Sequence, residues 1–182
     1  MKTNTRMLIL AALFAALTAV GAFLRIPLGA LSMSLQTFFT ILAGVLLGAK
    51  WGALSQTVYV VIGLVGLPVF TMGGGPGYIF QPSFGFLLGL IPGALVTGLI
   101  AKDRGDRPAW VVLACVVGTA VVYAVGLPYM YLIFNAYLGK TMTVGAAVTA
   151  GMLVYLPGDA IKIVVTALLA RPLVRALARS AG

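Results

Sequence analysis

Long runs of apolar residues, separated by short polar or charged stretches, make up nearly the whole chain. A helix needs roughly 20 mostly apolar residues to cross the hydrocarbon core of a membrane. The pattern therefore predicts an all-α integral membrane protein with six transmembrane helices in a single membrane domain over residues 1–182. The expected helices cover residues 7–24, 35–49, 51–67, 84–101, 108–134 and 151–170.

The first apolar run follows Lys2 and Arg6, so it also has the layout of a secretory signal peptide, with Val20-Gly21-Ala22 as a cleavage sequence. Further apolar runs follow it, and a first transmembrane helix can direct its own insertion. We interpret this run as the first helix of the bundle.

Composition supports a membrane protein. Of the 182 residues, 62% are hydrophobic and 8% are charged, whereas soluble domains carry roughly 25% charged residues. The net charge of +9 comes from cations that lie singly between apolar runs, which is typical of topology signals rather than of a nucleic-acid surface.

Lys and Arg are distributed unevenly between the two sides of the predicted bundle, and the richer side of a membrane protein is cytoplasmic. We therefore expect both termini to be cytoplasmic. The poorer side holds Arg25 and Lys140. The richer side holds Lys2, Arg6, Lys50, Lys102, Arg104, Arg107, Arg171, Arg175 and Arg179.

Several kinds of chemistry lack their usual residues. The chain has no His and a single Cys, Cys115, so neither a zinc site nor an intrachain disulfide is expected. No phosphate-binding loop motif occurs, so the chain brings no ATPase of its own. An intramembrane hydrolase would need a serine facing Lys162, which the sequence does not place. We expect no catalytic residues, no bound metal and no cofactor.

Asp159 and Lys162 are the charged residues that lie well inside an apolar run. Each costs about 2.5–3.5 kcal/mol to place in a bilayer, and their spacing puts both on one face of a helix. One interpretation is a self-neutralising pair that holds helices together. The other is a polar anchor for a ligand, which the break expected at Pro157-Gly158 favours.

Three Pro- and Gly-containing stretches fall at a similar depth in the outer half of the predicted bundle. Such breaks are tolerated where protein or a watery cavity covers the backbone. They indicate either an outer cavity or ordinary proline kinks. The stretches are Gly66-Leu67-Pro68, Gly126-Leu127-Pro128 and Leu156-Pro157-Gly158.

The loop over residues 73–86 combines glycines with aromatic side chains and one long amide, Gln81. Such a loop allows close approach of its backbone to a ligand while rings such as Tyr78 and Phe84 pack on it. It would otherwise be a surface connector. Gln36, at the start of the second predicted helix, is a further candidate, unless it lies in the membrane interface.

The first predicted helix carries small residues at intervals of four, which lets helices approach closely in a membrane. The partner is either another helix of this chain or another protein. These residues are Ala11, Ala15 and Ala19, with Ala12 and Ala16 beside them.

Four stretches, in order and spread over most of the chain, resemble the BioY family of biotin-binding S components of energy-coupling-factor (ECF) transporters. In the third of them this chain reads Pro82-Ser83-Phe84-Gly85 where the family often has Pro-Thr-Gly-Gly. The stretches are Leu35-Gln36-Thr37, Gly66-Leu67-Pro68-Val69-Phe70, Pro82-Ser83-Phe84-Gly85-Phe86 and Leu156-Pro157-Gly158-Asp159 with Lys162.

The resemblance implies six helices in a bacterial or archaeal plasma membrane and binding of biotin at the outer side. It also implies docking on a transmembrane coupling protein and on ABC-type ATPases that use the ATP. The family's Ala-rich first helix faces the coupling protein, which gives the alanines above an intermolecular role. The alternative is a self-sufficient secondary transporter or channel in which Asp159 is a proton site.

The resemblance also implies that Gln81, Asp159 and Lys162 contact biotin. Asp159 would accept a hydrogen bond from a ureido N–H group, and Lys162 would meet the ureido oxygen or the carboxylate. Arg25, just outside the first helix, is a weaker candidate for the carboxylate. Aromatic residues would cover the rings of the ligand.

Overall fold

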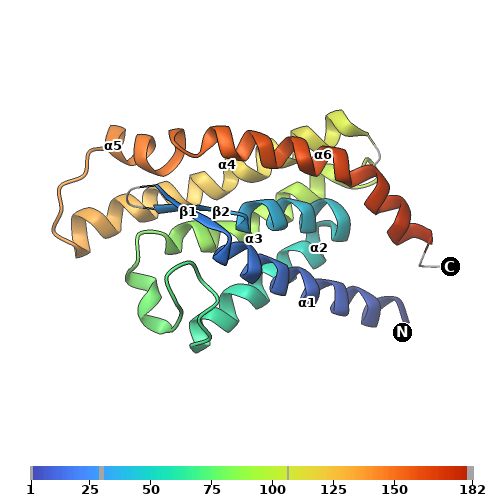
Figure 1. The fold of residues 1–182 in the computed structure, drawn as a ribbon, viewed down its shortest axis with the longest axis horizontal. Coiled ribbons are helices and arrows are strands. Elements are labelled where there is room, and N and C mark those ends of the chain that lie inside the picture. The colour runs from blue at the N-terminus through green and yellow to red at the C-terminus, as the bar shows by residue number, and fades with distance from the viewer. Residues whose placement is uncertain (1, 29–30, 106, 180–182) are drawn as a thin grey trace.

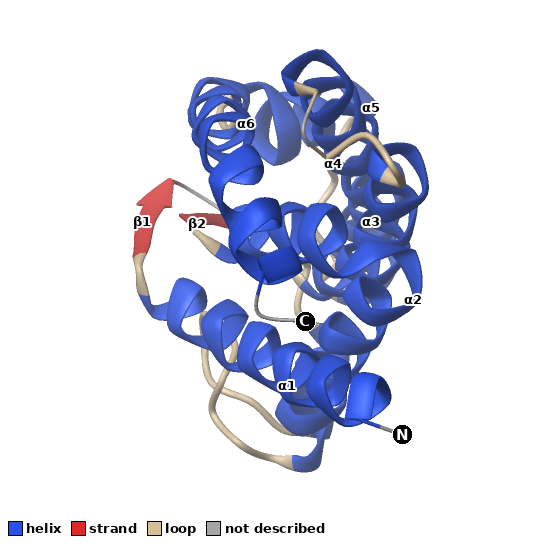
Figure 2. Cartoon of the chain, turned by 90° about the vertical axis from the view of Figure 1, so that its right-hand side faces the viewer, coloured by secondary structure: helices blue, strands red, loops and turns tan. Residues whose placement is uncertain are grey.

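The computed structural model describes residues 2–28, 31–105 and 107–179, which form a helical bundle with one small β-hairpin (Figures 1 and 2). The start of the first helix and the end of the last helix lie at the same end of the bundle (Figure 1). The main elements are α1 (Lys2–Phe23), β1 (Arg25–Leu28), β2 (Leu31–Ser34), α2 (Gln36–Val65), α3 (Phe84–Ala101), α4 (Pro108–Leu132), α5 (Val144–Val148) and α6 (Leu156–Arg179).

Within the described residues, 5 helical stretches are long and apolar enough to cross a membrane. This agrees with the all-α membrane architecture expected from the apolar runs. The stretches are Asn4–Phe23, Gln36–Val65, Phe84–Ala101, Pro108–Tyr137 and Val144–Arg179.

The helix α2 folds back on itself at Gly48, where the backbone is not helical and φ is 78°. Gln36 Nε2 donates to the Tyr59 hydroxyl at 2.6 Å, and Thr40 Oγ1 donates to Gln56 Oε1 at 2.9 Å. In a straight helix, residues 36 and 59 would lie about 35 Å apart. The two halves of α2 are therefore antiparallel, and they correspond to the separate helices expected over 35–49 and 51–67.

Close packing beside this turn depends on residues without side chains. A Cβ atom on Gly52 would lie 3.0 Å from the Cα of Gly44, and a Cβ atom on Gly44 would lie 2.7 Å from the carbonyl oxygen of Ala94 in α3. Small residues let helix backbones approach in this way. The first half of α2 is thus held between its own second half and α3.

The β-hairpin of β1 and β2 was not expected from the sequence. Its strands are antiparallel, with Arg25 opposite Ser34 and Ile26 opposite Met33. The hairpin contacts both α1 and α6, since α1 and β2 contact each other and Gly158 of α6 lies against Met33 (Figure 2). It therefore covers the bundle where the sequence indicated only a connection.

The last helix differs from its expected range of 151–170. A π-helical turn over Thr149–Leu153 comes first, and α6 then begins at Leu156. Pro157 lies in the first turn, where its missing N–H costs no helical hydrogen bond. The Pro-Gly pair therefore starts a helix instead of interrupting one.

The stretch around Pro128, expected as a break near the end of the helix over 108–134, does not interrupt α4, which continues through this residue to Leu132. By contrast, α2 does end at Val65, directly before Gly66-Leu67-Pro68. Of the three expected interruptions, one ends a helix, one starts a helix and one lies within a helix.

Candidate ligand-binding site

A cavity opens between β2, the start of α2, α3, α4 and α6, and encloses about 680 Å³ of space, including the part open to solvent. Its apolar lining comes from Leu31, Met33, Phe86, Leu87, Leu90, Val122 and Gly151. Its polar lining comes from Ser32, Ser34, Gln36, Thr37, Thr71, Ser83, Thr119, Tyr123, Tyr155, Asp159 and Lys162.

An ion pair lies in this lining. Lys162 Nζ is 2.9 Å from Asp159 Oδ1, and the two residues are 8% and 5% exposed. Asp159 stands in the first turn of α6, where the positive end of the helix dipole stabilises a carboxylate. Lys162, one turn later, can reach that carboxylate because residues three apart share a helix face.

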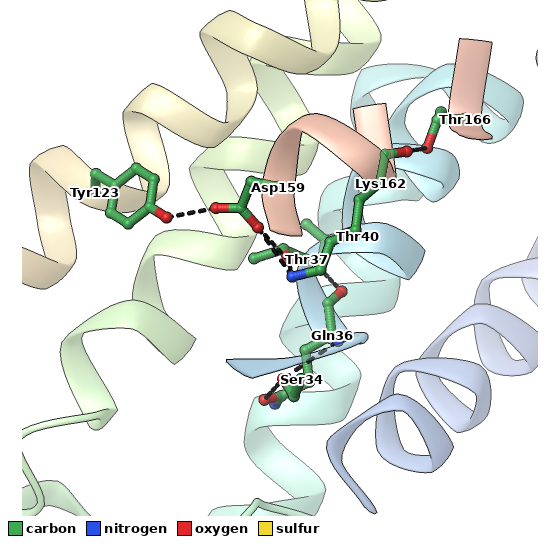
Figure 3. A network of polar contacts seen from close by, with 8 residues as sticks. All are labelled: Ser34, Gln36, Thr37, Thr40, Tyr123, Asp159, Lys162 and Thr166. Carbon is green, nitrogen blue, oxygen red and sulfur yellow. Dashed lines mark hydrogen bonds and ion pairs between the residues drawn. The ribbon is translucent and has the colours of Figure 1, made fainter. Parts of the chain in front are cut away.

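Two further side chains complete the surroundings of the pair (Figure 3). Lys162 Nζ also donates to Thr37 Oγ1 at 2.8 Å, and Thr37 Oγ1 is 3.5 Å from Asp159 Oδ1. The Tyr123 hydroxyl, from α4, donates to Asp159 Oδ2. Both carboxylate oxygens are thus hydrogen-bonded, which is how a buried charge is tolerated.

Gln36 connects the hairpin to the rest of the site. Ser34 Oγ donates to Gln36 Oε1 at 2.8 Å, and Gln36 Nε2 donates to the Tyr59 hydroxyl at 2.6 Å. The Tyr59 hydroxyl in turn donates to the Val69 carbonyl oxygen at 3.0 Å. These bonds tie β2, both halves of α2 and the following loop into one wall.

The hydroxyl of Tyr78 holds two residues of the cavity lining in place. The Tyr78 hydroxyl lies 3.1 Å from Thr71 Oγ1 and accepts a hydrogen bond from Ser83 Oγ at 3.3 Å. Thr71 and Ser83 line the cavity, whereas Tyr78 does not. The tyrosine therefore fixes the positions of two hydroxyl groups that a ligand would meet.

The structure brings together three of the residues singled out as ligand contacts: Asp159, Lys162 and Gln36 all line the cavity. The two charged residues lie on α6 and the amide lies at the start of α2. Because these elements are far apart in the sequence, the fold is what makes them one site.

The other four predicted contacts lie outside the cavity lining. Tyr78 and Phe84 are buried in a hydrophobic cluster, where their rings pack against other aromatic side chains. Gln81 is half-buried in the preceding loop, and Arg25 is exposed on β1. The rings of Tyr78 and Phe84 therefore point into the protein core instead of into the cavity.

Sequence reasoning missed Thr37 and Tyr123, which hold the ion pair. Thr37 is next to Gln36, and this position was the one signal that could have identified it. Tyr123 lies within an apolar run, where a tyrosine carries no distinguishing pattern. Within the described residues, no cluster of three or more His, Cys, Asp or Glu side chains could hold a metal ion.

The small residues of α1 divide into two faces. Ala11 and Ala15 are 2% and 4% exposed, and Ala15 packs in the same cluster as Tyr59 of α2. Ala19 is half-buried, whereas Ala12 and Ala16 are exposed. In this structure Ala11 and Ala15 of the stripe pack within the chain, which is one of the two arrangements expected from the sequence.

A family model described as the BioY family matches residues 1–179. "Probable biotin transporter BioY" of Lysinibacillus sphaericus is 43% identical over 172 residues, covering 93% of this chain and 87% of that protein. "Biotin transporter BioY" of Thermotoga maritima is 39% identical over 166 residues, covering 91% of this chain and 94% of that protein.

One solved structure is also similar, the crystal structure of the S-component for biotin from an ECF-type ABC transporter. It superposes with a TM-score of 0.83 at 25% sequence identity, covering 94% of this chain and 92% of the other. The similarity therefore extends over nearly the whole chain.

Proposed function

The chain belongs to the BioY family, and we propose that it is the biotin-binding S component of an ECF-type vitamin importer. It captures biotin at the outer face of the plasma membrane and delivers it together with an ATP-driven coupling module. It is a transport subunit and not an enzyme. The observation that carries this proposal is the cavity built around the buried Asp159–Lys162 pair in a member of this family.

The polar groups of the cavity suit the ureido ring of biotin, which offers two N–H donors and one carbonyl acceptor. Asp159 is positioned to accept from an N–H group, since a carboxylate has about four acceptor sites. Lys162 has three N–H donors and uses two of them within the protein. Its third is available to donate to the ureido oxygen.

The apolar lining suits the remainder of the ligand, a sulfur-containing ring and an aliphatic chain. Phe86, Leu87 and Val122 present carbon surface beside the polar groups. Small-molecule sites commonly combine an apolar lining with a few polar groups, and the lining of this cavity has that character.

We assign supporting roles to the predicted contacts that lie outside the lining. Tyr78 positions Thr71 and Ser83, and Phe84 packs behind it in the aromatic cluster. Gln81 and Arg25 would reach the ligand only after the loop or the hairpin moves. The protein would bind biotin as a transported ligand and would need no cofactor.

For the membrane topology we propose six spans with both termini cytoplasmic. Counting the two halves of α2 separately supports this number, since they run in opposite directions about Gly48. Residues 36–47 extend about 18 Å, shorter than a full crossing, and the hairpin beside them occupies the rest of the outer half. Such non-helical backbone is tolerated where it lines a cavity.

The partners of the S component are the transmembrane coupling protein and the ATPases, which use the ATP. We propose that the exposed alanines of α1, Ala12 and Ala16, form the surface that meets the coupling protein. They are spaced four apart and face away from the chain's own helices, so a partner helix can approach closely.

The proposal is tested by equilibrium binding of biotin to the purified full-length protein in detergent, with riboflavin and thiamine as control vitamins. We expect saturable binding of one biotin per chain and no saturable binding of the other two. A folded protein that does not bind biotin would contradict the proposal.

A further inference from the structure

The charges that line the cavity cancel. Among the described lining residues, Asp159 and Lys162 are the charged ones, and they are paired with each other at 2.9 Å. The remaining polar lining consists of hydroxyl groups and the amide of Gln36. A negatively charged ligand entering the cavity therefore meets no cation that lacks a counter-ion.

Lys162 is committed to its neighbours within the protein. Its Nζ atom bonds both Asp159 Oδ1, at 2.9 Å, and Thr37 Oγ1, at 2.8 Å, and the residue is 8% exposed. Placing a ligand carboxylate beside it would put two carboxylates on one ammonium group. The site would then carry a net negative charge, which a buried environment disfavours strongly.

Arg25 is the cation nearest to the cavity along the hairpin. It lies directly opposite Ser34, a lining residue, and directly opposed residues project from the same face of a hairpin. Its side chain is exposed, so water and salt screen its charge. It can attract an anion at the rim without supplying a buried counter-charge.

From this charge balance, and resting on the proposed function, we propose that the cavity recognises the ring system of biotin and leaves its carboxyl group at the water-facing mouth. Uncharged carboxamides of biotin are then ligands of this protein alongside biotin itself. A carboxamide replaces one oxygen with NH₂, so it has nearly the same shape and differs chiefly in charge.

The test is competition of labelled biotin, bound to the purified full-length protein, by unlabelled biotin and by biotinamide. We expect biotinamide to compete with a Kd within tenfold of that of biotin. A Kd more than tenfold weaker, in a protein that binds biotin, would overturn this inference and leave the proposed function standing. Failure of labelled biotin to bind would overturn the proposed function, and the inference with it.

Two variants identify where the carboxyl group of biotin lies. In each variant, the Kd of biotinamide is compared with the Kd of biotin as a ratio. In Lys162→Gln both ligands should weaken together, so that the ratio changes less than threefold. In Arg25→Gln, an exposed change that leaves the fold intact, the ratio should again change less than threefold. Selective weakening of biotin by tenfold or more in either variant would place a carboxylate-binding cation there and refute the inference.

Discussion

Asp159 is held by side chains from three elements. Lys162 of α6 and Thr37 of α2 lie at one carboxylate oxygen, and Tyr123 of α4 donates to the other. An ionised carboxylate is costly in an apolar interior unless its oxygens are hydrogen-bonded and its charge is paired. The bonds that make the burial of Asp159 tolerable also fix the orientation of its carboxylate.

We predict that Asp159→Asn weakens biotin binding about 10- to 100-fold, because a hydrogen bond to a charged group contributes roughly 1.5–3 kcal/mol. The change also leaves the Lys162 ammonium group without its counter-ion. Equilibrium binding with labelled biotin measures the effect. Asp103→Asn, in the exposed loop after α3, is the matched control and should bind like the parent. Parental affinity in folded Asp159→Asn would show that this carboxylate is not a ligand contact.

The Tyr123 hydroxyl positions the carboxylate without a charge of its own. We predict that Tyr123→Phe weakens biotin binding about tenfold, because Asp159 Oδ2 loses its donor. Tyr131→Phe is the control, since this residue of α4 does not line the cavity. Biotin titrations of both proteins, with thermal unfolding to check the fold, measure the effect. Equal affinities in the two variants would remove Tyr123 from the site.

The residues of the site that could be predicted from the sequence are those whose side chains are unfavourable inside a membrane. Asp159 and Lys162 are conspicuous because charges inside an apolar run are expensive. Thr37 and Tyr123 incur no such penalty, so one sequence does not distinguish them from ordinary residues. The position of Tyr78 and Phe84 outside the cavity lining could not be predicted, because ring content alone does not show which way a loop turns its side chains.

At the scale of elements, the fold-back of α2 depends on a buried polar layer. Thr40 Oγ1 donates to Gln56 Oε1 at 2.9 Å, and Gln56 Nε2 lies 3.3 Å from Thr18 Oγ1 of α1. These residues are fully buried, so a slip in the helix register would leave polar groups unpaired. The layer therefore fixes how the halves of α2 and α1 align beneath the cavity wall.

The turn at Gly48 gives a prediction about stability. Its φ of 78° and ψ of 178° lie in a region of backbone conformation that is essentially restricted to glycine, and no atom lies within 4 Å of an added Cβ. We predict that Gly48→Ala lowers the unfolding free energy by about 1–3 kcal/mol through backbone strain alone.

Thermal unfolding in detergent measures this loss. Gly77→Ala is the matched control, because an added Cβ at Gly77 also meets open space and its backbone is not in the left-handed region. A melting temperature for Gly48→Ala equal to that of the control would mean that the turn does not depend on glycine.

Element boundaries were predictable where hydropathy changes sharply. The range 84–101 coincides with α3, since Pro- and Gly-rich residues precede it and Lys102 follows it. The hairpin was missed because its two strands have four residues each, too few for an alternating pattern to emerge. The start of α6 was missed because Pro157 was interpreted as a break, although proline is also favoured in a first helical turn.

For the whole molecule, the two ends of the bundle differ in character. The start of α1, the end of α3, the start of α4 and the end of α6 lie at one end of the bundle (Figure 1). Lys102, Arg104 and Arg107 stand between α3 and α4 in the sequence. By the positive-inside rule, we propose that this cationic end lies in the cytoplasm. The proposed capture of an external ligand requires the cavity to face the opposite side.

The exposed face of α1 gives a prediction that separates binding from transport. We predict that Ala12→Leu with Ala16→Leu leaves biotin binding unchanged but lowers biotin uptake at least tenfold in cells that contain the coupling module, because bulky side chains hold a partner helix away. The control is Leu168→Trp, an exposed change on α6. Parental uptake by the double variant would place the docking surface elsewhere.

The most direct test of the central claim, that the cavity beside Asp159 and Lys162 holds biotin, is a structure of the protein determined with biotin bound. We predict ligand density between α4, α6 and the hairpin, with a ureido N–H group at hydrogen-bonding distance, about 3 Å, from the Asp159 carboxylate. Biotin density at any other place in the molecule, with this cavity empty, would contradict the account.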